Sequence, residues 1–415
     1  MILLSHPMGN ANVRAVADGL RAQDLLHSFH TSIAAFPGNR WDRLSQLAPL
    51  RDFARRSFSP ALAEVTVQYP TGELLRMAAK KTGLGFLTAH ETGPYSVDGI
   101  YRAHDRKVAA FIGKNASALR AVYAYEDGAL ETFRTAKSQG LTTVYDLPIA
   151  YWETGRRLMR EEADRLPAWA PTLGGGIKDS DAKVARKVEE LELADVVVGP
   201  GYFVMDSLPD WAATKQRVVS PFGSPPAAPA SPSAKRNDGP LRVLFVGSMG
   251  QRKGLADLFA AVNRFSERDV ELVVLGSPLA ELSFYRAQCP NFRYEPTRSH
   301  AGVLELMAEC DVFCLPSIVE GRALVMQEAM SRGLPVIITP NTGGQDLVVE
   351  EETGFLVPIR SPERIAEKID WFVRNRGRIP EMGRAAAAHA ARYTWSKYGN
   401  DVVSALSELL KPVRV

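Results

Sequence analysis

The second half of the sequence alternates short apolar runs with longer segments of helical periodicity, and this alternation constrains the fold more than any other feature. The predicted strands are residues 241–246, 270–275, 292–294, 311–315 and 335–339, and the predicted helices are residues 255–265, 279–288, 301–309 and 324–332. Continuous apolar strands are typical of a parallel sheet whose two faces are both covered by helices. The alternation therefore predicts an α/β, doubly wound domain.

The first half follows the same pattern less regularly, and a second α/β unit is expected there. Its predicted strands are residues 2–4, 85–88, 121–125, 142–145 and 196–198. Because 415 residues exceed what one hydrophobic core normally organises, we expect two domains. The predicted parts are an N-terminal domain (1–220), a proline-rich linker (221–240), a C-terminal domain (241–394) and a terminal amphipathic helix (395–415).

Charge and cysteine content exclude several classes of protein. The 50 Lys and Arg residues nearly balance the 47 Asp and Glu residues, so bulk charge predicts no nucleic-acid partner. Cys289, Cys310 and Cys314 lack a second pair that would complete a zinc site, which predicts buried, reduced thiols in a cytoplasmic protein. Neither a secretion signal nor a membrane-spanning run is recognisable, so we expect no export.

Glycines, hydroxyls and charges follow the predicted strands of the second half. In an open parallel sheet, ligands bind beyond the carboxyl ends of the strands, so these residues predict a binding site. The first such loop contains Gly247 and Ser248 and places Arg252 and Lys253 just before a helix. Glycines let backbone amides approach a ligand, and a helix N-terminus with two cations suits a diphosphate. The alternative is a glycine turn followed by solvated charges.

Two glutamates provide a second signal. Glu320 lies in the loop after one predicted strand and Glu328 in the early turns of the next helix, so both can reach one ligand. A carboxylate accepts two hydroxyl hydrogen bonds at once, which suits the vicinal diols of a ribose or a hexose. The amides of Arg322, Ala323 and Leu324 open the helix and are placed to hold phosphate oxygens. The alternative interpretation is two unrelated surface glutamates.

These segments are similar to a known family. Residues 316–336, PSIVEGRALVMQEAMSRGLPV, resemble the E-x7-E motif of retaining glycosyltransferases of family 4, which have the GT-B fold of two Rossmann-like domains facing across a cleft. The upstream FVGSMGQRKGL resembles the phosphate-binding loop of that family, and the resemblance is strong over residues 241–392. Further matches are the TGG segment at 341–348, the TGFLV segment at 352–357 and, more weakly, Gly9-Asn10, residues 125–127 and residues 145–148.

The resemblance implies roles for these positions. Arg252 or Lys253 would neutralise the diphosphate of a nucleotide sugar. Glu320 would contact hydroxyls of the transferred sugar, and Glu328 would hold the ribose. The implied substrate-binding positions around them are Gly9, Asn10, Gly247, Ser248, Arg322, Ala323 and Leu324. Because cations and helix dipoles can stabilise the departing diphosphate, we expect no metal and no cofactor, and the nucleoside diphosphate sugar is the donor substrate.

The acceptor side is less well defined. Asp146 stands where the family often has a histidine, and the resemblance implies that it positions an acceptor hydroxyl. His90 follows a predicted strand end and is a candidate acceptor contact, with an ordinary hydrogen-bonded histidine as the alternative. His104 and Asp105 lie in a helical pattern and are predicted to be solvated.

Residues 40–58 are basic and partly amphipathic, with five arginines against Asp42 and Asp52. One interpretation is peripheral contact with the inner face of an anionic cell membrane, which would suit the lipid-linked acceptors that the family often uses. The other is a helix of the acceptor domain with a charged outer face.

The predicted function is a retaining glycosyltransferase that moves a hexose from a nucleoside diphosphate sugar to a hydroxyl of a bacterial envelope glycan or glycolipid. Two alternatives stay open on the same fold. One is a sugar-nucleotide epimerase, and the other is a non-catalytic GT-B subunit that binds a ligand or partner.

Overall fold

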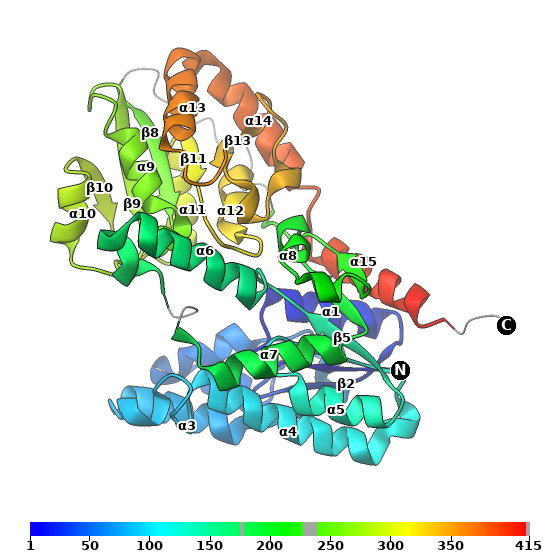
Figure 1. Cartoon of the computed structure of the whole chain (residues 1–415). Helices are drawn as coiled ribbons and strands as arrows, with labels where there is room; N and C mark the ends of the chain where they lie inside the picture. The colour runs from blue at the N-terminus through cyan, green and yellow to red at the C-terminus, as the bar shows by residue number, and fades with distance from the viewer. Residues whose placement is uncertain (175–177, 227–238, 412–415) are drawn as a thin grey trace.

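The computed structural model describes residues 1–174, 178–226 and 239–411. These residues form two β-sheets, each flanked by helices, and the two units lie one above the other in Figure 1. Every strand pairing is parallel. The predicted α/β class is therefore confirmed.

The first sheet has the strand order β3-β2-β1-β4-β5-β6-β7. Its strands are β1 (Ile2–Ser5), β2 (Leu26–Thr31), β3 (Thr66–Gln68), β4 (Ala121–Tyr125), β5 (Thr142–Asp146), β6 (Val196–Gly199) and β7 (Gln216–Val219). The helices of this half are α1 (Ala11–Ala22), α2 (Arg40–Ser45), α3 (Pro70–Lys81), α4 (Val97–Asn115), α5 (Leu130–Ser138), α6 (Trp152–Arg165), α7 (Asp181–Leu193) and α8 (Tyr202–Asp206).

Three strands of this sheet, β2, β3 and β7, are not predicted by the sequence pattern. Strand β2 reads LHSFHT, and its polar side chains are buried because they bond to one another: Ser28 Oγ lies 2.9 Å from His30 Nε2, whose ring also bonds to the hydroxyl of Tyr69. The predicted strand Gly85–Thr88 is wrong, since these residues form a 3-10 helix. Phe86 is 70% exposed, so the apolar run faces solvent instead of a core.

The second sheet has the strand order β10-β9-β8-β11-β12-β13. Its strands are β8 (Leu241–Val246), β9 (Val270–Leu275), β10 (Phe292–Glu295), β11 (Val312–Leu315), β12 (Val336–Ile338) and β13 (Gly354–Leu356). Its helices are α9 (Leu255–Val262), α10 (Leu282–Gln288), α11 (His300–Glu309), α12 (Leu324–Ser331), α13 (Pro362–Arg374) and α14 (Ile379–Ala390). The predicted strands are confirmed, with β13 in addition, and the three cysteines are buried free thiols as predicted.

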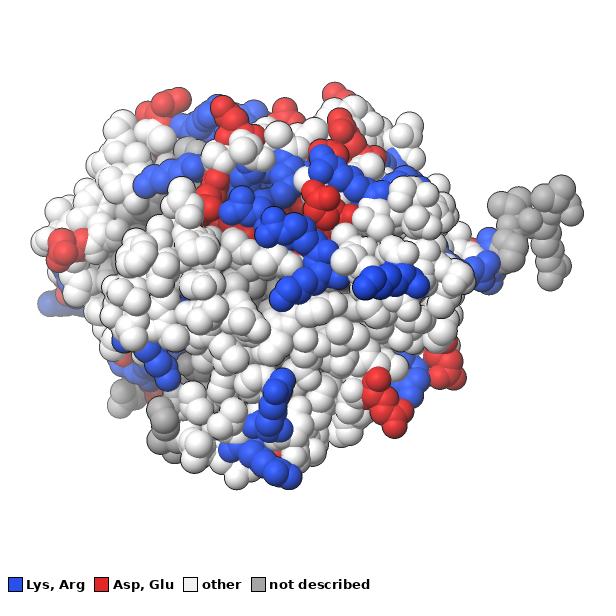
Figure 2. Space-filling view, turned by 90° about the horizontal axis from the view of Figure 1, so that it is seen from below, with Lys and Arg blue, Asp and Glu red and all other residues white. Residues whose placement is uncertain are grey.

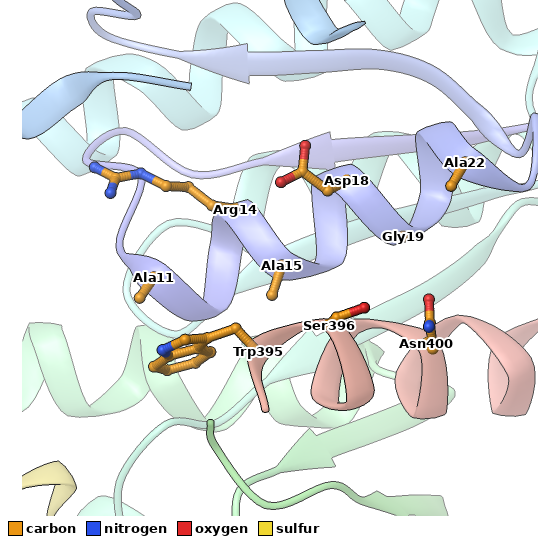
Figure 3. Close-up of a pocket in the computed structure, with 9 residues that line it drawn as sticks. All are labelled: Ala11, Arg14, Ala15, Asp18, Gly19, Ala22, Trp395, Ser396 and Asn400. Atoms are coloured by element: carbon orange, nitrogen blue, oxygen red, sulfur yellow. The ribbon is translucent and has the colours of Figure 1, made fainter. Parts of the chain in front are cut away.

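Each half of the chain sends one segment across to the other sheet. Helix α6 and the 3-10 helix at Pro167–Thr172 pack on the second sheet, where Trp169 joins the core and Leu158 packs with Val319. Helix α15 (Trp395–Leu409) returns to the first sheet and lies along α1 (Figure 3). The helices approach closely, because a Cβ on Gly399 would lie 2.1 Å from the Ala15 carbonyl oxygen.

The start of the predicted linker is packed instead of free. The ring of Phe222 is buried against Trp395 and Tyr398. The side-chain amide of Gln327 donates to the carbonyl of Phe222 and to the hydroxyl of Ser224. Local composition does not reveal this packing, because the aromatic surface comes from α15. Residues 227–238 of the linker lie outside the described residues.

The basic stretch 40–58 forms α2 and a 3-10 helix at Ala48–Arg56. Trp41 and Phe53 are buried, with their ring centres 5.4 Å apart, whereas Leu47 is 53% exposed. Trp41 and Phe53 are the two aromatic side chains that a membrane-binding face of this stretch would insert into the lipid. Both lie inside the protein instead. Within the part of the chain that the structure describes, no helix combines the length and the apolar character needed to cross a membrane.

Charged side chains are distributed unevenly over the surface. Figure 2 shows the face seen from below, the side of Figure 1 where α3, α4 and α5 lie. Lys and Arg side chains gather in the upper half of this view beside acidic side chains, and much of the remaining surface is uncharged. The molecule thus has local basic regions although its net charge is only +3.

Candidate functional site

The loops after β8 and β11 meet at the carboxyl edge of the second sheet. Nη1 of Arg252 lies 2.6 Å from Oε1 of Glu320, and Nζ of Lys253 lies 2.5 Å from the same oxygen. Arg252 also donates to the carbonyl of Val319. The structure thus brings three predicted residues to one point, and we call Arg252, Lys253 and Glu320 the Arg-Lys-Glu cluster.

Glycines allow the two loops to pack directly on each other. Gly254 has a φ of 73°, in the left-handed region, and a Cβ there would lie 2.0 Å from the carbonyl oxygen of Pro316. The N–H of Ile318 donates to the carbonyl of Arg252 at 2.9 Å. A Cβ on Gly247 would lie 3.5 Å from the side chain of Lys253. The backbone therefore holds both cations against Glu320.

The Arg-Lys-Glu cluster carries one uncompensated positive charge. Two cations face one carboxylate, so its formal charge is 2 − 1 = +1. Burial lowers the pKa of Lys253, and the Glu320 carboxylate opposes that shift. The second oxygen of Glu320 makes no hydrogen bond with a described residue. The cluster therefore has room for two ligand groups at once: an anionic oxygen on the cations and a hydroxyl on the second oxygen of Glu320.

The predicted amide cradle at the start of α12 is only partly available. The N–H of Ala323 donates to the carbonyl of Thr342 at 3.1 Å, so this predicted phosphate donor is already used. The N–H groups of Arg322 and Leu324 and the hydroxyl of Ser248 make no hydrogen bond with a described residue. Two of the three predicted amides thus remain free to bind a ligand.

The side chain of Arg322 is bonded inside the protein and is not exposed to the proposed phosphate site. It is fully buried, donates to both carboxylate oxygens of Asp346 (2.7 and 3.0 Å), and also donates to the carbonyl of Gly343 and the side chain of Gln327. A substrate contact at this position is therefore confined to the backbone.

Glu328 lies apart from the Arg-Lys-Glu cluster. Its Oε1 lies 3.0 Å from Nε2 of His300, and no contact within the described residues links it to Glu320. Its side chain is 20% exposed, so it can accept from a ligand. Sequence reasoning missed His300, although the residue opens the helix that follows β10 at the same sheet edge.

The loop after β1 differs from its prediction. Gly9 has a φ of 67°, and a Cβ there would lie 2.3 Å from the ring of Phe58. The N–H groups of Met8 and Gly9 both donate to Nδ1 of His6 at 2.9 Å. Burial lowers the pKa of His6 to about 3, so the ring is a neutral acceptor. The prediction that the Gly9 amide holds phosphate is wrong, because His6 occupies it. The adjacent Asn10 side chain bonds to no described residue.

A cavity of about 300 Å³ lies beside this loop and is lined by residues of the first half of the chain. It borders Pro148, and a Cβ on Gly321 would lie 1.8 Å from the Pro148 carbonyl oxygen. The N–H of Ala150 donates to the Glu320 carbonyl at 3.3 Å. The cavity therefore opens beside the loop that carries the Arg-Lys-Glu cluster. The polar side chains lining it belong to His6, Asn10, Asn12, His90, Asp98, Tyr101, Tyr125, Glu126, Asp127 and Lys183.

Cations of α7 balance the carboxylates of this cavity. Lys183 lies 2.9 Å from Asp98, Lys187 lies 3.0 Å from Glu126, and Arg186 lies 2.9 Å from Asp127. Sequence reasoning missed these three residues, although their spacing of three and four positions places them on one helix face. Paired charges at the wall give a polar surface suited to hydroxyl groups.

Asp146 does not reach this cavity. It is 1% exposed, and the hydroxyl of Tyr123 donates to its Oδ2 at 2.5 Å. Burial raises the pKa of Asp146 to about 7, while hydrogen bonds from Tyr123, Tyr125 and Tyr398 oppose the shift. The prediction that Asp146 positions an acceptor hydroxyl is wrong, because α15 lays Tyr398 over the end of β5.

His90 lies in a turn after a 3-10 helix, not at a strand end, and it lines the cavity, so its contact with an acceptor stays a prediction. Ligand atoms of His90, Glu91 and Asp179 lie within 4.8 Å of one another, a spacing that suits a metal ion. Nζ of Lys183 lies 3.2 Å from Asp179 and already supplies positive charge there.

His104 and Asp105 are buried, so their predicted solvation is wrong. Nε2 of His104 lies 3.1 Å from Oγ of Ser5. Asp105 accepts the N–H groups of Glu131 and Thr132 at the start of α5. Both side chains face the core because α4 packs against α5 and the sheet.

The two sheets and their connections form the GT-B fold. Sucrose-phosphate synthase from Thermosynechococcus elongatus superposes with a TM-score of 0.64 at 18% identity, covering 98% of each chain. Anabaena HepE in complex with UDP superposes with a TM-score of 0.61 at 14% identity, covering 98% of this chain and 99% of that one.

Residues 229–391 match the family model described as "Glycosyl transferases group 1", so the second half of the chain carries a domain of this kind. D-inositol 3-phosphate glycosyltransferase of Corynebacterium diphtheriae is 30% identical over 165 residues, which is 37% of this chain. The chain spans 39% of the length of that relative.

Proposed function

We propose that this protein is a retaining glycosyltransferase of family 4 that moves a hexose from a nucleoside diphosphate sugar to a hydroxyl acceptor. The Arg-Lys-Glu cluster carries the proposal. It lies within the group 1 segment, at the sheet edge where α/β folds bind ligands. The structure of HepE, which has the same fold, contains UDP, and this supports a nucleotide donor.

In the proposed reaction, the bond between the sugar C1 and its phosphate oxygen breaks, and the nucleoside diphosphate leaves with the bonding electrons. The acceptor oxygen bonds to C1 on the same face, and its proton passes to an oxygen of the departing diphosphate. Arg252 and Lys253 stabilise the charge that develops on this group. Glu320 accepts from a sugar hydroxyl through its free oxygen, and Glu328 accepts from the ribose.

The cavity lined by Pro148 is the proposed acceptor site, because the segment of Pro148 contacts the Glu320 loop and the cavity presents hydrogen-bonding side chains. We propose a polyhydroxylated acceptor such as a bacterial envelope glycan or glycolipid. The Corynebacterium relative is named for D-inositol 3-phosphate, which is also a polyhydroxylated molecule. With Trp41 and Phe53 buried, a membrane contact of residues 40–58 would be electrostatic.

Calorimetry with UDP, GDP and ADP, followed by a panel of sugar nucleotides tested for slow donor hydrolysis, examines this proposal. We expect one nucleotide to bind and its sugar conjugate to be hydrolysed. The absence of binding at millimolar nucleotide would favour a non-catalytic subunit. Release of a free epimerised sugar nucleotide, without a glycosidic product when acceptors are present, would favour an epimerase.

A further inference from the structure

A second cavity, of about 440 Å³, lies on the other side of the loop after β1 and is lined mainly by basic side chains. Six of its eleven lining residues are Lys or Arg and one is Glu, which gives a formal charge of 6 − 1 = +5. We call this the basic cavity. Its charged lining residues are Arg14, Arg55, Arg56, Glu73, Arg76, Lys80 and Lys81.

The wall of the basic cavity is built around one buried carboxylate. Glu73 has no exposed side-chain surface, and it accepts hydrogen bonds from Nε and Nη2 of Arg76 at 2.7 and 2.6 Å. Arg56 donates to the same carboxylate. The side chains of Arg56 and Arg76 are only 11% and 12% exposed. Two guanidinium groups are thus held in place by a single counter-charge.

Several N–H groups of the Arg and Lys side chains in this wall have no oxygen acceptor among the described residues. Nη1 of Arg76 bonds to no described residue, and the only partner of Arg56 Nη1 is the sulfur of Met8 at 4.0 Å. The exposed side chains of Arg55 and Lys80 form no ion pair within the described residues. Because the two largely buried guanidinium groups of Arg56 and Arg76 share the single carboxylate of Glu73, one positive charge is left uncompensated, and these donors favour an anionic ligand.

Helix α1 contributes Arg14 and its own N-terminus to the basic cavity. Figure 3 shows Arg14 and Asp18 pointing away from α15, and Asp18 is the carboxylate that acts on Arg14. The N-terminus of α1 lies at Asn10, where the free N–H groups of the first turn favour an anion.

The basic cavity adjoins the proposed acceptor site. Asn10 lines both cavities, so a ligand passing over Asn10 can place one end in each. Pro148 also lines the acceptor site and lies beside the loop that carries Glu320. An anion in the basic cavity would therefore anchor an acceptor whose hydroxyl points toward the donor sugar.

We propose that the acceptor carries a phosphate group, which binds in the basic cavity while its hydroxyl-bearing part occupies the adjoining cavity. This proposal rests on the proposed function. Arg side chains bind phosphate through paired, charge-assisted hydrogen bonds, which the fixed geometry of Arg56 and Arg76 favours. The exposed cations of Arg55 and Lys80, which line the same cavity, complete the proposed phosphate site. The phosphate can belong to a free polyol phosphate or to a lipid headgroup.

Binding of glycerol 3-phosphate, measured by calorimetry, tests the free source. Binding to phosphatidylcholine vesicles with and without phosphatidic acid tests the lipid source. The variant Arg55→Gln/Lys80→Gln removes two exposed cations and leaves the buried Arg56, Glu73 and Arg76 network intact. The matched control, Arg106→Gln/Lys114→Gln, removes two exposed cations of α4 that do not line the cavity.

We expect the cavity variant to weaken binding of one of the two probes by about tenfold, as for loss of one charge-assisted hydrogen bond. The control should bind like the original protein. Loss only with glycerol 3-phosphate supports a free phosphate, and loss only with phosphatidic acid vesicles supports a lipid headgroup.

Equal binding by the cavity variant and the control would overturn the proposal. Displacement of glycerol 3-phosphate by a saturating mixture of UDP, GDP and ADP would also overturn it, because the cavity would then hold the donor diphosphate. The proposed function would survive that result, since nucleotide binding is measured separately.

Discussion

The loops after β1 and β8 occupy equivalent places, each between an interior strand of a parallel sheet and the first helix of its unit. Both need a glycine in the left-handed region, Gly9 at 67° and Gly254 at 73°. In the second loop, Arg252 and Lys253 belong to the loop itself. In the first loop, the amide of Gly9 is bonded to His6, and the nearby cations come mainly from other elements.

The difference shows which kinds of site a sequence reveals. The cations of the second loop are neighbours in the chain, so their type and spacing already indicate an anion site. The basic cavity draws its charges from three separate elements that only the fold brings together. The predictions below test whether the two loops serve two different substrates.

The variant Arg252→Ala/Lys253→Ala should show the largest effect. We expect donor hydrolysis to fall by about a thousandfold, because preorganised donors that stabilise a departing oxyanion each contribute strongly. The measurement is the initial rate of hydrolysis of the sugar nucleotide. The control is Arg264→Ala, which removes an exposed ion pair with Glu363. Unchanged turnover of the double variant would separate the Arg-Lys-Glu cluster from catalysis.

Asp146→Asn should change the pH dependence of stability. Burial raises the pKa of Asp146 to about 7 in the folded state. The unfolded carboxyl loses its proton near pH 4, so the native state loses stability as pH rises from about 4 to about 7. The expected loss is on the order of 4 kcal/mol, and the Asn variant should lack it.

Urea unfolding at pH 4, 5.5 and 7 measures this dependence. Asp24→Asn is the control, because its carboxylate is 90% exposed. If Asp146 faced the acceptor instead, the substitution would change the acceptor KM and leave the pH dependence of unfolding as it is.

Gly321→Ala tests the contact between the two halves. A Cβ there would lie 1.8 Å from the carbonyl oxygen of Pro148, so the Glu320 loop must move away from the acceptor cavity. We expect a loss of about 2 kcal/mol in the free energy of unfolding and a fall in transfer larger than the fall in donor hydrolysis. Gly377→Ala is the control, since nothing lies within 4 Å of a Cβ there. Equal falls in both rates would contradict this coupling.

Glu328→Ala should show the smallest effect. Loss of hydrogen bonds to a ribose diol should weaken nucleotide binding by about tenfold, with donor hydrolysis at saturation nearly unchanged. Calorimetry with the nucleotide measures it. Glu305→Ala, an exposed glutamate of α11, serves as the control. An unchanged dissociation constant would remove Glu328 from the donor site.

The second sheet was largely predictable because its strands β8, β9, β11 and β12 are mostly apolar runs that are buried on both faces. The first sheet was predictable only in part, because the polar side chains of β2 find partners such as Tyr69 that lie far away in the sequence. The meeting of Arg252, Lys253 and Glu320 follows from the rule that parallel strands end at one edge. The burial of Asp146 and the use of the Gly9 amide could not be foreseen, because neighbouring segments decide whether a polar group faces solvent.

The sequence by itself determined the α/β class and the loops of the second half, each following a strand, that carry polar and charged residues. It also determined that Arg252 and Lys253 are the two cations beside Glu320. These features depend on periodicity and short-range spacing. Only the tertiary structure decided which polar groups are free to bind. Helix α15 covers Asp146, His6 occupies the Gly9 amide, and α3 places Arg76 beside Arg56. The physical reason is that a hydrogen-bonding group whose capacity is already used inside the protein must give up a partner to bind a ligand, and these partners are set by packing across the whole chain.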